Sequence, residues 1–271
     1  MISALDKILI SLGQDHISRH QRIFMKTENA WTPTKYVRRK GKLRASRDAK
    51  EIGVGSRMIG DLVARFYDQS IRKYATGSLI DLGCGTVPLY ETYREFVTEI
   101  TCVDWSSPAH GQDHLDLICN LADDLPFEDS KFQTIILSDV LEHLPEPQNL
   151  WPELARLLSP GGRLLMNTPF LHCLHEQPHD YYRFTSHALR RFAESSGFEV
   201  LFLEPLGGTP EVLTDISAKH LQFVPIVGNS LARAIQALTY WFVNTRIGAN
   251  LSAKTGDAFP LGYVMVAERV A

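Results

Sequence analysis

The chain has 271 residues, of which 44% are hydrophobic and 22% charged, values typical of a globular protein of one large domain with additions. Its formal net charge of −3 excludes a strong overall attraction to nucleic acid, so we expect no nucleic-acid partner. Four widely spaced cysteines, no signal-peptide pattern and no uncharged apolar run of about 18 residues together predict a cytoplasmic protein.

Residues 1–55 are polar and basic, and we predict them to form a helical N-terminal extension before a main domain over 56–271. Eight basic residues and one acid, Asp48, lie between Lys35 and Lys50. Such a run can dock a phosphate-bearing substrate or nucleic acid. Because the whole chain is slightly acidic and only Tyr36 interleaves the run, a solvated arm is the favoured interpretation.

Regular alternation of helices and strands follows. Apolar residues at helical spacing predict a helix over 56–74. Strands are predicted at 78–82, 99–104, 115–119, 132–137, 163–167, 198–203 and 261–268, with helices at 148–158 and 186–196. The first five strands, joined by helical crossovers, imply a parallel sheet. The last strand alternates enough to sit at a half-exposed position.

A long segment, 206–258, separates the last two predicted strands and is helical around 230–243. Its apolar residues predict a helical insertion that forms core or a lid over an acceptor site. The alternative functions are a homodimer face and a peripheral membrane contact.

The stretch with the most chemical content runs from a short apolar strand through Asp81 into Gly83 and Gly85, and the next strand ends in Asp104. The glycines allow a sharp turn with backbone close to a ligand, and the later acid suits ribose hydroxyls. A dinucleotide site needs a third glycine where Pro88 stands, which argues against an NAD-dependent oxidoreductase.

Five segments resemble, in order and spacing, the class I S-adenosylmethionine-dependent methyltransferases. They are Leu79–Thr86, Val103–Asp104, Leu125–Phe132, Ser138–Leu144 and Leu157–Leu164. The resemblance implies a Rossmann-like, doubly wound α/β fold with a seven-stranded, mostly parallel sheet whose last strand is antiparallel. It also implies S-adenosyl-L-methionine as cofactor and S-adenosyl-L-homocysteine as product.

The same resemblance assigns the cofactor contacts. The amino acid end of the cofactor would lie over the glycine turn beside Asp81, with Asp104 on the ribose and Trp105 against the adenine. Asn120 stands where many relatives have an acid toward the adenine amine. The expected cofactor-binding residues are Asp81, Gly83, Cys84, Gly85, Asp104, Trp105, Asn120, Leu121, Ser138 and Asp139.

On the acceptor side we expect a small molecule or glycan-type metabolite that is methylated on a hydroxyl. A hydroxyl acceptor needs a base, and candidate bases lie near the predicted site. Two histidines near strand ends, His143 and His179, are the candidate catalytic bases. The residues expected to contact the acceptor are Asp180, Tyr181, Tyr182 and Arg183, with Asp180 as the partner of an imidazole.

Three histidines with Cys173 and Glu176 raise the question of a metal, but their spacing is loose, so none is expected. The histidines are His172, His175 and His179. Two other functions stay open: methylation of an amine, which needs less help from a base, and a non-catalytic scaffold that binds the cofactor.

Overall fold

The computed structural model describes residues 30–106 and 113–270, so the predicted extension over 1–29 lies outside the described residues. The strands are β1 (Tyr36–Arg39), β2 (Lys42–Ala45), β3 (Ser78–Leu82), β4 (Glu99–Asp104), β5 (Leu117–Ile118), β6 (Phe132–Ser138), β7 (Leu158–Pro169), β8 (Phe198–Leu206) and β9 (Gly262–Arg269). The helices are α2 (Arg57–Tyr74), α3 (Tyr90–Tyr93), α4 (Leu150–Leu157), α5 (Ser186–Ser195), α6 (Thr209–Leu221), α7 (Gly228–Val243) and α8 (Arg246–Gly256), with short 3-10 turns η2 (Val54–Ser56), η3 (Leu141–His143) and η4 (Pro147–Asn149).

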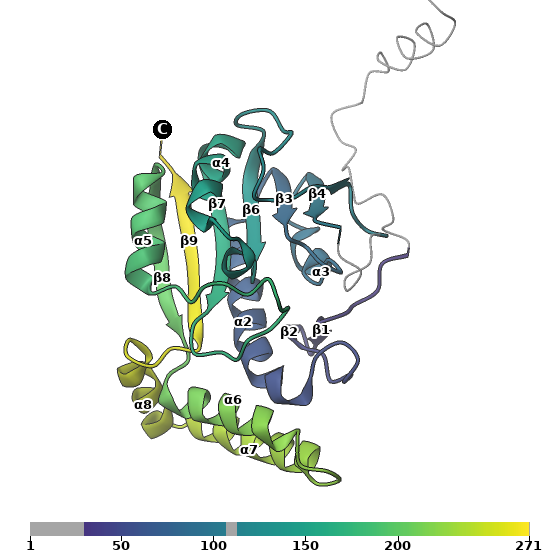
Figure 1. Cartoon of the computed structure of the whole chain (residues 1–271), viewed down its shortest axis with the longest axis vertical. Coiled ribbons are helices and arrows are strands. Elements are labelled where there is room, and N and C mark those ends of the chain that lie inside the picture. Colours follow the sequence, from purple (N-terminus) through teal and green to yellow (C-terminus); the bar gives the residue numbers. More distant parts are fainter. Residues whose placement is uncertain (1–29, 107–112, 271) are drawn as a thin grey trace, which may run out of the picture.

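Seven strands form one sheet in the order β5-β4-β3-β6-β7-β9-β8 (Figure 1). Strands β3 to β7 pair in parallel, and β9 runs antiparallel to both of its neighbours. This is the predicted seven-stranded fold. The half-exposed position predicted for the last strand is wrong, because β9 lies between β7 and β8 and six of its eight residues are buried.

Alternating strand residues feed two separate cores, one on each face of the sheet. On one face Ile80 and Leu137 pack with Trp151 of α4 and Leu189 of α5. On the other face the side chains of α2 and α3 pack against Leu79 and its neighbours. Since both faces are covered, the strands are near-continuous apolar runs and the polar groups concentrate at their ends.

The described part of the N-terminal extension is a β-hairpin and not the predicted helix. β1 and β2 pair antiparallel, and Gly41 at the turn has φ +75°. Asp61 of α2 accepts the Ala45 N–H at 2.9 Å and the Arg47 guanidinium at 2.7 Å, so the hairpin docks on α2. The solvated-arm interpretation fails for Lys35, Arg38 and Arg47, because each of these cations has a buried or half-buried acidic partner.

The insertion over 206–258 forms α6, α7 and α8, a helical group beyond the end of the sheet where the parallel strands finish (Figure 1). The amide of Gln236 in α7 donates to the Val54 carbonyl and accepts from the Met58 N–H, which fixes the group to the start of α2. Large apolar side chains at its far edge are exposed, among them Phe223, Ile226 and Trp241.

A single chain does not test the dimer and membrane contacts predicted for this edge, and they remain predictions. In the described ranges, no helix combines the length and the apolar character that a membrane crossing needs.

Candidate active site

A cavity of about 600 Å³ opens where β3, β4 and β6 end. This is the edge at which open α/β sheets bind ligands. Every residue expected to hold the cofactor lines it: Asp81, Gly83, Cys84, Gly85, Asp104, Trp105, Asn120, Leu121, Ser138 and Asp139. His143, His179 and Tyr181 line it as well. None of the described residues of 206–258 lines it, and the lid role of the helical insertion stays a prediction.

The glycine turn at the floor of the cavity depends on left-handed backbone and on close packing. Gly83 has φ +70°, and a Cβ at this position would lie 2.4 Å from a methyl group of Val140. Gly85 has φ +54° and its N–H donates to Asp104 Oδ2 at 2.7 Å. The turn therefore holds the Asp104 carboxylate beside the backbone that a ligand would touch.

Asp81 is a carboxylate with almost no access to water. Its side chain is buried at the end of β3 and accepts a hydrogen bond from the Tyr93 hydroxyl at 3.1 Å. Burial raises the pKa of Asp81 to about 7; the Tyr93 hydrogen bond opposes this shift and the nearby Asp104 adds to it. Asp81 can thus offer a carboxylate to a cationic group of a ligand.

Asp139 sits at the centre of a second polar group, which sequence reasoning identified only in part. Lys35 Nζ lies 3.1 Å from Asp139 Oδ2, and the Asn167 amide donates to Oδ1 at 2.6 Å. Asn167 in turn accepts from the hydroxyls of Tyr67 and Ser138, both at 2.9 Å. Burial alone would raise the pKa of Asp139, but Lys35 outweighs it and lowers that pKa. Asp139 is therefore held ionised and fixed in orientation.

The two predicted bases make different contacts beside the cavity. His143 Nδ1 donates to the His179 carbonyl oxygen at 2.6 Å, and its Nε2 is buried without a hydrogen-bond partner among the described residues. The His179 imidazole is half-buried, packs edge-on against Trp105 with ring centroids 5.0 Å apart, and has Nδ1 3.2 Å from the Tyr181 hydroxyl. Both histidines line the cavity, but they are held differently: His143 by a backbone carbonyl, and His179 by the side chains of Trp105 and Tyr181.

Three of the residues expected to contact the acceptor are absent from the cavity lining. The Asp180 carboxylate is buried and makes two hydrogen bonds with Arg183, at 2.6 and 2.8 Å, and it lies beside His175 instead of His179. The Arg183 pairing lowers the pKa of Asp180. The Tyr182 hydroxyl donates to the Pro145 carbonyl at 2.8 Å. These residues brace the loop over 170–185, because their polar atoms are used within the chain.

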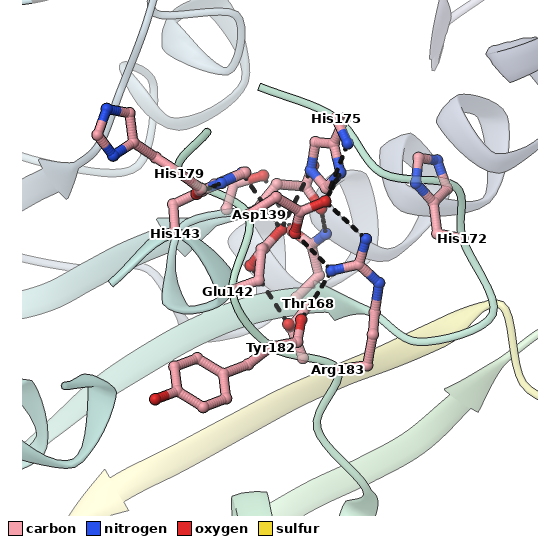
Figure 2. A network of polar contacts seen from close by, with 12 residues as sticks. Asp139, Glu142, His143, Thr168, His172, His175, His179, Tyr182 and Arg183 are labelled. Carbon is pink, nitrogen blue, oxygen red and sulfur yellow. Dashed lines mark hydrogen bonds and ion pairs between the residues drawn. The ribbon is translucent and has the colours of Figure 1, made fainter. Parts of the chain in front are cut away.

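A buried cluster next to the cavity was missed by sequence reasoning. Glu142, His143 and His175 place one ligand atom each within 4.8 Å of one another, an arrangement able to hold a metal ion (Figure 2). The irregular histidine set considered from the sequence contributes only His175 to it. The adjacent Glu142 and His143 after a strand were a signal for a metal site. The third member, His175, comes from a loop in which no regular pattern places a side chain.

Comparisons with known proteins point in one direction. The family described as a methyltransferase domain matches residues 80–166, the segment from β3 to β7 that builds the cavity floor. A ubiquinone biosynthesis O-methyltransferase of Coxiella burnetii is 26% identical over 174 residues, covering 53% of this chain and 74% of that protein.

Solved structures share the fold at low sequence identity. The [4+2]-cyclase SpnF superposes with a TM-score of 0.52 and 18% identity, covering 78% of this chain and 84% of its own. Phosphoethanolamine N-methyltransferase 2 of Haemonchus contortus, in complex with S-adenosylhomocysteine, has a TM-score of 0.50 and 15% identity. The match covers 82% of this chain and 57% of that chain. These likenesses establish the fold, and the presence of a cyclase among them means that the reaction must be argued from the site.

Proposed function

This chain is a class I S-adenosylmethionine-dependent methyltransferase, and from that premise we propose that it methylates a hydroxyl of a small molecule or a glycan-type metabolite. The observation that carries the proposal is the half-buried His179 imidazole, which lines the same cavity as the glycine turn and packs against Trp105. The O-methyltransferase named among the relatives supports oxygen as the acceptor atom.

The cavity fits the cofactor in size and in chemistry. Its volume of about 600 Å³ lies in the usual range for small-ligand sites. We assign Asp104 to the ribose hydroxyls and Asp81 to the ammonium group, because these two acids end adjacent parallel strands on either side of the glycine turn. We assign Trp105 to one face of the adenine, with Asn120 toward its amine. When bound, the cofactor supplies a methyl group on a sulfonium, already a good leaving group.

His179 is our candidate for the base. In the tautomer that we assign, Nδ1–H donates to the Tyr181 hydroxyl oxygen and leaves the Nε2 lone pair for the proton of the acceptor. Nε2 would take that proton when the bound cofactor supplied its methyl group to the acceptor oxygen. His143 is a positioning residue in this scheme, since its Nδ1–H holds the backbone carbonyl of His179.

An assay with isotope-labelled S-adenosylmethionine and a metabolite extract tests the function. We expect label in an O-methylated product, identified by mass, together with S-adenosylhomocysteine. Label on nitrogen would favour an amine acceptor instead, and cofactor binding without any product would favour a scaffold role.

Comparison of His179→Ala with His187→Ala tests the base. The second variant removes an exposed histidine of α5 that does not line the cavity. We expect His179→Ala to lower kcat by about 10²- to 10⁴-fold with an unchanged Kd for the cofactor, and His187→Ala to behave as wild type. Equal kcat values in the two variants would contradict the assignment.

A further inference from the structure

The cluster of Glu142, His143 and His175 contains a buried carboxylate oxygen with no hydrogen-bond donor. The Glu142 side chain is fully buried, and its Oε2 accepts from the Thr168 hydroxyl at 3.3 Å. Its other oxygen, Oε1, has no hydrogen-bond partner among the described residues. An unsatisfied buried carboxylate is costly, so a positively charged group or a metal belongs beside Oε1.

Two imidazole nitrogens face this oxygen (Figure 2). His143 Nε2 lies 3.8 Å and His175 Nε2 3.6 Å from Glu142 Oε1, both too long for hydrogen bonds. Four donors placed tetrahedrally about 2.0–2.1 Å from a zinc ion are roughly 3.4 Å apart. The two distances to Glu142 Oε1 are therefore close to those that a metal would set, and ligand atoms of all three residues lie within 4.8 Å of one another.

The surroundings of the two Nδ1 atoms favour protons there, which leaves both Nε2 lone pairs toward Glu142 Oε1. A carbonyl oxygen can only accept, so the 2.6 Å contact between His143 Nδ1 and the His179 carbonyl puts the proton of His143 on Nδ1. His175 Nδ1 makes no hydrogen bond among the described residues, but Oδ2 of the buried Asp180 carboxylate lies 3.3 Å from it, and a carboxylate at this distance favours a proton on Nδ1 there as well. Carbonyl and carboxylate partners of this kind typically orient histidines that ligate metals.

We propose that Glu142, His143 and His175 bind a divalent transition-metal ion of the zinc type. Two imidazole nitrogens and one carboxylate oxygen suit such an ion better than magnesium or calcium, which prefer oxygen ligands. Glu142 and His143 belong to η3 after β6, whereas His175 belongs to the loop that carries His179. The ion would tie this loop to the end of the sheet, whatever the acceptor is.

Metal binding by the full-length chain tests the site without an activity assay. After dialysis against a chelator, we expect the wild-type chain to take up one cobalt(II) ion with the visible absorption bands of a low-symmetry site, and zinc to displace it. If only hydrogen bonds and ion pairs hold the three side chains together, the chain will take up no cobalt. That result would overturn the proposal.

Variants locate the ion. We expect Glu142→Gln and His175→Ala each to weaken zinc binding at least tenfold. His172→Asn is the matched control: its ring centroid lies 5.1 Å from that of His175, but it is not a member of the cluster, so wild-type affinity is expected. Undiminished binding in both Glu142→Gln and His175→Ala would place the ion elsewhere and would also overturn the proposal.

Discussion

At the scale of single residues, Asp81 shows how the fold sets the charge of its own site. An exposed aspartate is ionised throughout the physiological range, but burial raises the pKa of Asp81 to about 7. The chain without ligand therefore carries a largely protonated Asp81 in mildly acidic solution and a costly buried anion in alkaline solution.

The pKa of Asp81 predicts a pH dependence of stability. Between the unfolded pKa near 3.8 and the folded pKa of about 7, the folded chain binds more protons than the unfolded chain, so this group lowers the free energy of unfolding as pH rises. Asp81→Asn should remove this contribution. The free energy of unfolding of the variant, relative to that of wild type, should therefore rise by up to about 1.4 kcal/mol per pH unit across that window. Urea unfolding from pH 4.5 to 8 measures the difference.

Asp129→Asn is the control for that series, because its side chain is 77% exposed. Its stability should follow that of wild type at every pH. Parallel curves for wild type and Asp81→Asn would contradict the interpretation of Asp81.

The residues that sequence analysis assigned to the cofactor are those that follow strand ends. Asp81, Asp104 and Ser138 lie on β3, β4 and β6, and parallel strands bring such positions to one edge. Lys35 and His175 reach the same region from a hairpin and an irregular loop, where no periodicity places a side chain. Asp180 lies beside the imidazole of His175 instead of that of His179, because neighbouring residues in a loop point in different directions.

At the scale of elements, the basic run between Lys35 and Lys50 is a docked hairpin. Its cations meet partners distant in sequence: Arg38 pairs with Asp68, Arg47 with Asp61 and Lys35 with Asp139. These pairings cannot be seen from the charges within the run, because the partners lie elsewhere in the sequence. The sequence therefore indicated a solvated arm. The segments on either side of the hairpin reach the site, since Lys35 and Lys50 line the cavity.

Asp61 is predicted to be the main attachment of this hairpin. Asp61→Ala leaves the Ala45 N–H and the Arg47 guanidinium without their acceptor, so we expect a loss of about 1–3 kcal/mol in the free energy of unfolding. Faster proteolysis between 38 and 50 should accompany the loss.

Asp129→Ala removes an exposed ion pair with Arg156 and should cost no more than about 1 kcal/mol. If the two alanine variants unfold alike and resist protease alike, Asp61 does not anchor the hairpin.

At the scale of the whole molecule, the fold was predictable because strand-helix alternation with buried parallel strands admits few topologies. The antiparallel direction of β9 came from the family resemblance. Its insertion between β7 and β8 was not predicted, since its own alternation indicated a more exposed place. The helical insertion was recognised as one segment, but its three helices and their anchoring through Gln236 depend on distant contacts.

Cofactor binding should stabilise the whole chain. A ligand at 100 times its Kd adds about 2.7 kcal/mol to the free energy of unfolding, which for a chain of this size raises Tm by roughly 5–11 °C. We expect S-adenosylhomocysteine to produce such a shift in scanning calorimetry and NAD to produce none. Asp104→Asn should greatly reduce the shift. An equal response to NAD would contradict the cofactor assignment.

The place of β9 in the sheet constrains the order in which the chain acquires its structure. β8 pairs with no strand other than β9 in the described part of the chain, and the whole helical insertion lies between them in sequence. During synthesis β8 and the flank of β7 must wait, unpaired, until β9 emerges from the ribosome. A nascent chain stopped within the insertion would expose two strand edges, and a chaperone that shields such edges would act on this protein during that interval.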